Sequence, residues 1–315
     1  MALAVMDRPP SAARKGILYG LLASAIWGGY LAVTRRGIQS GLAAEDMAFL
    51  RYATAGLILL PWILKHSPQT LAGLGWPKGI VLTALAGPPF IIIGASGFHY
   101  APLAHSAVIQ LGMLTLMSNL LAAMLLGDVP NRRRILGLAI VIAGLCATVG
   151  AGPFAGGSTA WIGDILFATA GSMWALFTVL QRRWIVAPMH ATAIVSVLAA
   201  AIYAPIYLAS GHWRHLVPID PALLIEQIVV QGVLAGVIAL FAFGRAVQDL
   251  GASRAALFPA IAPGVAILIG IPLTGEIPTP LQGAGTAILS LGLFIAVGGI
   301  RAADGEAPRA LRTRD

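Results

Sequence analysis

Two stretches of this sequence repeat one pattern, and that pattern decides how the chain folds. The first reads GDVPNRRRILGLAIVIAGLCATVG from Gly127 to Gly150. The second reads GEIPTPLQGAGTAILSLGLFIAVG from Gly275 to Gly298. Each begins with glycine, an acidic residue and a proline, and the matched glycines lie 148 residues apart. A period near half the chain length indicates a duplicated unit rather than a solenoid.

A second repeat lies upstream of each copy, at an offset of 147 residues. Its members are Gly16, Ala23, Trp27, Arg35 and Arg36, which recur as Gly163, Ala170, Trp174, Arg182 and Arg183. The sequence therefore predicts two repeated halves with short flanking segments. The predicted divisions are a lead at 1–15, a first half at 16–150, a linker at 151–160, a second half at 161–299 and a basic tail at 300–315.

Composition places the chain in a lipid bilayer. Of its 315 residues, 58% are hydrophobic and 10% are charged, with a mean hydropathy of +0.86. A soluble domain carries about 25% charged residues. The net charge of +8 comes from short loops between apolar spans, so we expect a lipid partner and no nucleic acid. The single cysteine, Cys146, excludes a disulfide within the chain.

Ten apolar runs are long enough to cross the bilayer as helices, which need about 20 residues each. Lipid offers no partner for unpaired backbone groups, so helices are the expected structure. The first run is not a cleaved signal peptide, because its pattern recurs deep in the chain at 163–183. The predicted spans are 17–34, 46–64, 79–98, 104–126, 134–150, 161–180, 190–209, 224–243, 253–274 and 280–299.

The basic residues fix the predicted orientation. With the N-terminus in the cytoplasm, sixteen Lys and Arg lie inside and three, Arg35, Arg36 and Arg214, lie outside. This asymmetry follows the positive-inside rule and places both termini in the cytoplasm. Each half has five spans, an odd number, so the second half enters the membrane from the opposite side. Inverted repeats of this kind are typical of secondary transporters.

The chain also resembles the EamA repeat of the drug/metabolite transporter superfamily over about residues 16–299. In the second half the matching residues are Arg245-Ala246, Gly251 to Ala255, Pro263, Gly275-Glu276, Pro278, Gly285 and Gly292. In the first half they are Trp27-Gly28, Arg51, Tyr100-Ala101 and Gly127. Asp128 departs from the usual glutamate, and Thr115 stands where the second half has Pro263.

This resemblance implies an all-α integral membrane fold of ten transmembrane helices, in two inverted five-helix repeats around a central cavity. It also implies export of metabolites or amino acids, with no cofactor. We expect a multi-pass protein of a bacterial inner membrane that exports a small metabolite, such as an amino acid or an amphipathic compound. The sequence names neither the substrate nor the oligomeric state.

Seven residues are candidates for a substrate site. Trp27 and Trp174 are repeat-equivalent and lie inside spans, where they either grip an apolar substrate or pack a helix crossing. Gln110 and Gln231 are polar groups that should avoid lipid, and either line a wet cavity or bond between helices. The remaining candidates are Gly87, Pro88 and Arg51.

Gly87-Pro88-Pro89 interrupts the third span, and such a break either exposes carbonyls to a substrate or only bends the helix. Arg51 is the one basic residue within a span. It either reaches back to the membrane interface or binds a substrate carboxylate. No acidic residue lies near the middle of a span, which favours facilitated or exchange transport over coupling through a buried carboxylate.

Two features of the sequence bear on other function classes. Gly94-Ala95-Ser96-Gly97, with His99 and His105 nearby, resembles the serine motif of rhomboid proteases. Ten spans in two inverted halves do not match that fold, and no phosphate loop, zinc-spaced histidine pair or cysteine cluster is present, so we expect no enzyme. A non-transporting membrane scaffold is the other alternative, and it predicts packed repeats without a polar cavity.

Overall fold

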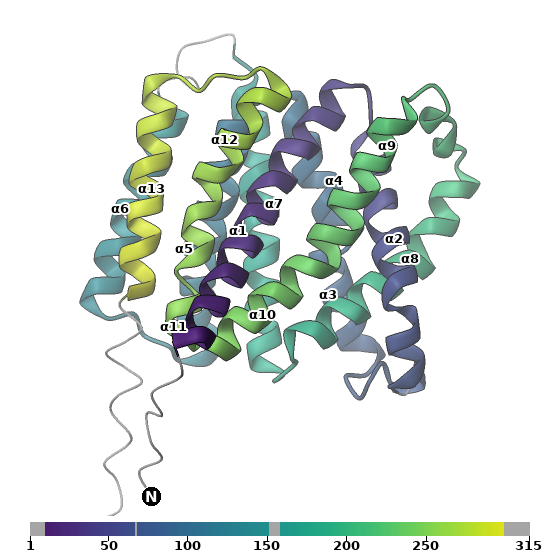
Figure 1. The fold of residues 1–315 in the computed structure, drawn as a ribbon, viewed down its shortest axis with the longest axis horizontal. Coiled ribbons are helices and arrows are strands. Elements are labelled where there is room, and N and C mark those ends of the chain that lie inside the picture. The colour runs from purple at the N-terminus through teal and green to yellow at the C-terminus, as the bar shows by residue number, and fades with distance from the viewer. Residues whose placement is uncertain (1–9, 67, 151–157, 299–315) are drawn as a thin grey trace, which may run out of the picture.

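The computed structural model describes residues 10–66, 68–150 and 158–298, which form a bundle of helices without a strand among them (Figure 1). The predicted all-α class is confirmed. The tail at 300–315 lies outside the described residues, as do 1–9 of the lead and 151–157 of the linker.

The first half contains six α-helices and two short 3-10 turns. These are α1 (Pro10–Gln39), α2 (Ala44–Lys65), η1 (Pro68–Thr70), α3 (Trp76–Ala86), α4 (Pro88–Ser96), η2 (Gly97–His99), α5 (Leu103–Leu126) and α6 (Arg132–Val149).

The second half repeats this order with more interruptions. Its elements are α7 (Ala160–Arg183), α8 (Pro188–Ala209), η4 (His212–Leu216), α9 (Pro221–Gln227), η5 (Ile228–Ile238), α10 (Ala239–Leu250), α11 (Ala252–Ala255), η6 (Phe258–Ile261), α12 (Ala262–Thr274) and α13 (Pro280–Gly298).

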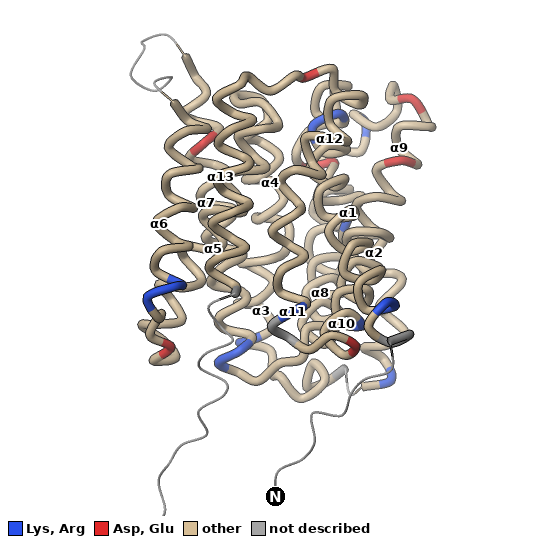
Figure 2. Tube along the Cα trace, turned by 60° about the vertical axis from the view of Figure 1, so that its left-hand side comes forward, with Lys and Arg blue, Asp and Glu red and all other residues tan. Residues whose placement is uncertain are grey.

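Eight of the described helical runs are long and apolar enough to cross a membrane. A ninth run, Phe258–Thr274, is shorter, and the tenth, α6, begins with three arginines that reduce its apolar length. These ten runs correspond to the ten predicted spans. Charged residues concentrate toward the two ends of the bundle (Figure 2). We call the end where α1 begins and α13 finishes the lower end, and the opposite end the upper end (Figure 1).

The repeated glycines bring α6 and α13 into close contact. A Cβ on Gly144 would lie 2.7 Å from the Leu289 backbone nitrogen, and one on Gly292 would lie 2.7 Å from that of Val141. Gly137 and Gly285 face the opposite helix in the same way. Small residues let membrane helices approach until their backbones touch. The stretch that appears twice in the sequence therefore packs against its own copy.

The other repeated helices exchange partners in a reciprocal way. α5 of the first half packs along α7 of the second, and α12, the equivalent of α5, packs along α1. α2 packs along its own equivalent, α8. This reciprocity is what a two-fold relation between the halves produces.

The Gly-acid-x-Pro motif ends a helix in each half. Gly127 follows α5 with φ of 68°, and Gly275 follows α12 with φ of 71°, a left-handed conformation that glycine adopts readily. Each glycine turns the chain so that the next residue, Asp128 or Glu276, stands at one end of the bundle.

The α6–α13 contact predicts that Gly292→Ala destabilises the protein while Gly283→Ala on the same helix does not. The added methyl group at position 292 must displace the α6 backbone, and overpacking of this kind typically costs about 1–3 kcal/mol. A Cβ at Gly283 meets nothing within 4 Å, and alanine favours the helix by up to about 1 kcal/mol. Thermal unfolding in detergent measures both variants; equal unfolding temperatures would contradict the packing.

Candidate functional site

A small pocket lies between helices of both halves. Three of its lining residues come from the first half, and the others come from α7, α8 and the eighth span. The lining consists of Arg51, Tyr52, Ala86, Trp174, Phe177, Thr192, Val195, Ser196, Gly236 and Leu240. Arg51 and Trp174 were predicted from sequence; the others were not, although Tyr52 adjoins Arg51 and Thr192 and Ser196 share one face of α8.

The predicted break in the third span adjoins the pocket, because Ala86, the last residue of α3, is one of the lining residues. Gly87 ends α3 and begins α4, with Pro88 as the first residue of the new helix. Proline has no N–H, so the break leaves carbonyls of α3 without their helical partners. The Tyr52 hydroxyl donates to the Ala86 carbonyl oxygen at 2.5 Å. Gly87 and Pro88 are not among the lining residues of the pocket; they directly follow Ala86, whose carbonyl Tyr52 joins to α2.

The eighth span has an irregularity that the sequence analysis missed. Ile228–Ile238 is a π-helix, and Gly236, near its end, lines the pocket. Gly232 within it is the repeat equivalent of Gly87 at an offset of 145 residues, so both halves depart from α-helical geometry at the same place. Prolines reveal the first departure in the sequence, whereas no residue type marks a π-helix. Such segments occur frequently at functional sites.

Arg51 is largely buried within the bundle. Its side chain is 8% exposed and lies about two helical turns from the start of α2. The guanidinium carbon lies 5.2 Å from the centre of the Tyr30 ring and 5.8 Å from that of the Tyr52 ring. These aromatic faces stabilise the cation and fix its position at the pocket.

The two equivalent tryptophans have different surroundings. Trp174 lines the pocket and forms tilted ring contacts with Phe90 and Phe177, at 5.0 and 5.1 Å between ring centres. Trp27 lies against Phe243 at 5.3 Å and packs beside Ala235 and Ala239 of the eighth span.

The two glutamines lie at helix contacts. Gln231 is fully buried, and its amide nitrogen donates to the Thr34 hydroxyl at 2.8 Å and to the Gln227 side-chain oxygen at 3.3 Å. Gln110 lies on α5 where that helix meets α7, since a Cβ on Gly171 would be 2.3 Å from its carbonyl oxygen. Gln231 thus joins α1 to the eighth span, and Gln110 stands at the α5–α7 contact.

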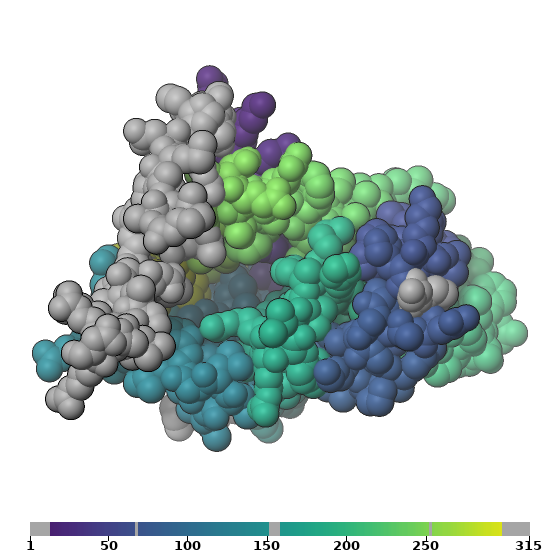
Figure 3. Space-filling view, turned by 90° about the horizontal axis from the view of Figure 1, so that it is seen from below, coloured from purple at the N-terminus to yellow at the C-terminus, as the bar shows by residue number. Residues whose placement is uncertain are grey.

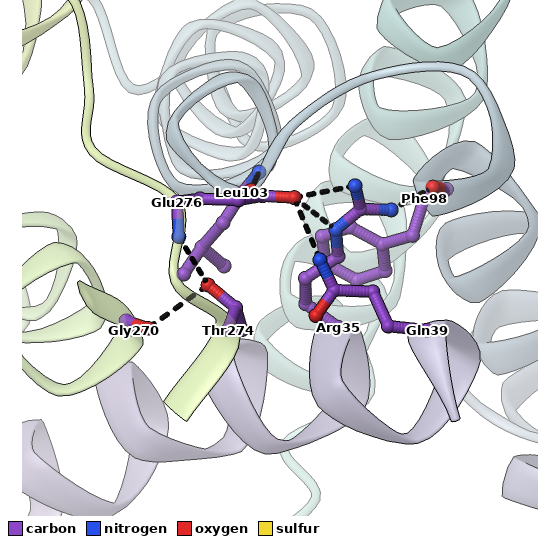
Figure 4. Close-up of polar contacts among 7 residues, drawn as sticks. All are labelled: Arg35, Gln39, Phe98, Leu103, Gly270, Thr274 and Glu276. Atoms are coloured by element: carbon purple, nitrogen blue, oxygen red, sulfur yellow. Dashed lines mark hydrogen bonds and ion pairs between the residues drawn. The ribbon is translucent and has the colours of Figure 1, made fainter. Parts of the chain in front are cut away.

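A network of polar contacts closes the upper end (Figure 4). Arg35 of α1 forms an ion pair with Glu276, with the Arg35 Nε atom 2.6 Å from Glu276 Oε1. The same guanidinium donates to the Phe98 carbonyl oxygen, and the second Glu276 oxygen accepts from the Leu103 backbone N–H at 2.8 Å. Gln39 adds a hydrogen bond of 3.1 Å to Glu276. The Arg35–Glu276 pair thereby fastens α1–α12 to the third span and to α5.

The repeat-equivalent residues at the lower end are not joined in this way. Arg182 and Asp128 are the equivalents of Arg35 and Glu276. They form an ion pair with 3.4 Å between Arg182 Nη2 and Asp128 Oδ2, and the Arg182 side chain is 59% exposed. At the upper end Arg35 bonds to Phe98 and Glu276 bonds to Leu103. Within the described ranges, no equivalent hydrogen bond or ion pair joins Arg182 to α10 or Asp128 to Gly251. Figure 3, a view of the lower end, shows a recess between the green α10–α11 segment and the teal end of α7.

The histidine near the serine motif has another partner. His105 Nδ1 lies 2.7 Å from Asp164 Oδ1, so this pair joins the upper ends of α5 and α7. Phe98 and Phe167 meet at the same end, with 5.1 Å between ring centres. Among the described residues no hydrogen bond joins His105 to Ser96.

Comparison with known proteins gives one family and several relatives. The model of the EamA-like transporter family matches residues 14–150 and 161–298. The uncharacterized transporter YyaM of Bacillus subtilis is 26% identical over 268 residues, 83% of each chain. An uncharacterized transporter of Archaeoglobus fulgidus is 23% identical over 276 residues, 86% of this chain and 93% of that one. A solved crystal structure is similar in fold, with a TM-score of 0.60, 18% identity and coverage of 93% of this chain and 99% of the other.

The bond from Tyr52 to the broken helix predicts that Tyr52→Phe lowers stability. The change leaves the buried Ala86 carbonyl without its partner, and loss of a hydrogen bond of this kind costs about 1 kcal/mol. Tyr100→Phe is the matched control, since that side chain is exposed. Thermal unfolding compares the two variants, and an unchanged unfolding temperature for Tyr52→Phe would show that the bond does not support the pocket wall.

Proposed function

Because this chain belongs to the EamA-like transporter family, we propose that it is a secondary transporter that exports a small metabolite by alternating access. The two family matches correspond to the proposed halves, residues 16–150 and 161–299. In this proposal the pocket is the substrate site. It is reached from one side of the membrane at a time, as movement of the halves opens and closes the two ends of the bundle.

The proposed orientation places the lower end in the cytoplasm of a cell with this protein in its inner membrane. Basic side chains gather at the lower end, among them Arg132, Arg133, Arg182 and Arg183, and such residues favour the cytoplasmic side. Both termini then lie in the cytoplasm. Substrate would reach the pocket through the lower recess, as export requires.

The observation that carries the proposal is the difference between two equivalent ends. The same kind of ion pair stands at each end. Among the described residues, Arg35 and Glu276 also bond to the third span and to α5, whereas at the lower end Asp128 pairs in addition with Arg134 of α6. A two-fold relation between the halves supplies both ends with an arginine and a carboxylate, so an analogous closed arrangement is also available to the lower end. The structure is consistent with one of two alternating conformations, the one that opens toward the cytoplasm.

The site residues have different proposed roles. Trp174 supplies an aromatic wall of the pocket, Gly87 and Pro88 form the break directly after the lining residue Ala86, and Arg51 supplies the charge. Trp27 would take the place of Trp174 when the lower end closes and the upper end opens. Gln110 and Gln231 lie on helix contacts, which suits them to hold helices together during the movement.

Arg35→Gln is predicted to open the upper end. A reporter thiol is introduced by Ser196→Cys in the pocket, on a background in which Cys146→Ala removes the natural cysteine. Losing the Arg35 contacts should shift the balance between conformations by about 1–2 kcal/mol, a factor of roughly 5–30. A membrane-impermeant thiol reagent applied from the upper side should therefore react correspondingly faster with the reporter.

Arg36→Gln is the matched control for this experiment. Arg36 pairs with Glu226 at 3.3 Å, which joins α1 to α9, and these elements already pack together. Its loss should leave the rate of labelling unchanged. Two results would contradict alternating access: equal labelling of the wild-type reporter from both sides, or labelling from the upper side that Arg35→Gln does not increase.

A further inference from the structure

The pocket contains a buried positive charge that no residue of the described structure neutralises. Arg51 is 8% exposed, and no Asp or Glu within the described ranges forms an ion pair with it. Arg35, Arg36 and Arg134 each pair with a carboxylate. A buried charge without a partner is costly, so it needs an anion that the protein itself does not provide.

The position of Arg51 indicates that this anion enters the pocket. Thr192 lies about one turn from the lower end of α8, whereas Arg51 lies about two turns from the upper end of α2. Of these two lining residues, Arg51 therefore comes from the upper part of the bundle and Thr192 from the lower part. Tyr30 and Tyr52 hold its position, so its N–H groups are preorganised for a ligand.

The rest of the lining limits the chemistry of the ligand. Trp174 and Phe177 offer aromatic surface, and Thr192 and Ser196 offer hydroxyl groups. The lining includes no acidic side chain, so an ammonium group on the ligand would find no counter-charge.

We propose that the substrate is a small organic monocarboxylate with a flat apolar body and without an ammonium group. Its carboxylate binds the Arg51 guanidinium, which can donate two parallel hydrogen bonds. Its apolar body packs against Trp174 and Phe177. This inference rests on the proposed transport function and narrows the substrate from small metabolites in general to carboxylates rather than zwitterionic amino acids.

The test compares ligands that differ in charge but hardly in shape. 3-Phenylpropionate carries the carboxylate, 3-phenylpropionamide replaces it with a neutral amide, and phenylalanine adds an ammonium group. Titration calorimetry with the purified protein in detergent should show the carboxylate binding roughly tenfold or more tighter than the amide, which corresponds to about 1.4 kcal/mol. Phenylalanine should bind more weakly than 3-phenylpropionate.

Arg51→Met is predicted to remove the preference for the carboxylate over the amide. Because the substitution also removes a buried unpaired charge, the unfolding temperature without ligand should not fall. A merely structural role for Arg51 would instead lower that temperature and leave the ratio of the two affinities unchanged. Arg36→Met at the upper end is the control and should keep the full preference.

Several results would overturn the inference. The wild type could bind the amide or phenylalanine more tightly than it binds 3-phenylpropionate. The carboxylate preference could persist in Arg51→Met. Folded protein could also bind none of the three compounds. Labelling of the Ser196→Cys reporter needs no substrate, so it tests the transport mechanism separately. If the reporter is labelled from one side only but the protein shows no carboxylate preference, the substrate inference alone is contradicted. If the reporter is labelled equally from both sides, the proposed transport mechanism is contradicted.

Discussion

The contact between α6 and α13 determines how the two halves meet, and the remaining architecture depends on it. Four equivalent glycines, Gly137, Gly144, Gly285 and Gly292, bring the two backbones together without intervening side chains. In lipid there is no hydrophobic force to hold helices together, so close packing of small residues supplies the attraction. A helix that packs on its own copy imposes a two-fold relation, and the exchange of partners between α5–α7 and α12–α1 follows the same relation.

This relation explains why the ends of the bundle carry matching groups in different states. Gly275 turns Glu276 toward Arg35 at the upper end, as Gly127 turns Asp128 toward Arg182 at the lower end. Only the upper pair extends to Phe98 and Leu103. In the proposed alternating access, the two ends would exchange these arrangements. The pocket lies between the ends, with Arg51 from the upper part of the bundle and Thr192 from the lower part among its lining residues.

The sequence was sufficient to predict what depends on repetition and on apolar length. The offset between Gly127 and Gly275 predicted the duplication, and the ten apolar runs predicted the helices. The break at Gly87-Pro88 was predictable because proline cannot continue a helical hydrogen-bond ladder. The π-helix at Gly232 was not, since no residue type specifies it. The partners of Gln231 and the burial of Arg51 depend on packing between helices distant in sequence, which periodicity does not encode.

The most direct test of alternating access is to measure distances between spin labels at both ends of the bundle, in one set of samples, by pulsed electron paramagnetic resonance. One pair of spin labels, at positions 183 and 248, reports the distance between α7 and α10 at the lower end, and another, at Ser40 and Tyr100, reports the upper end. Alternating access predicts a short and a long distance for each pair of labels. When the fraction of molecules with the long distance at the lower end rises, the fraction with the long distance at the upper end should fall. A single distance at each end, or two ends that lengthen together, would contradict alternating access.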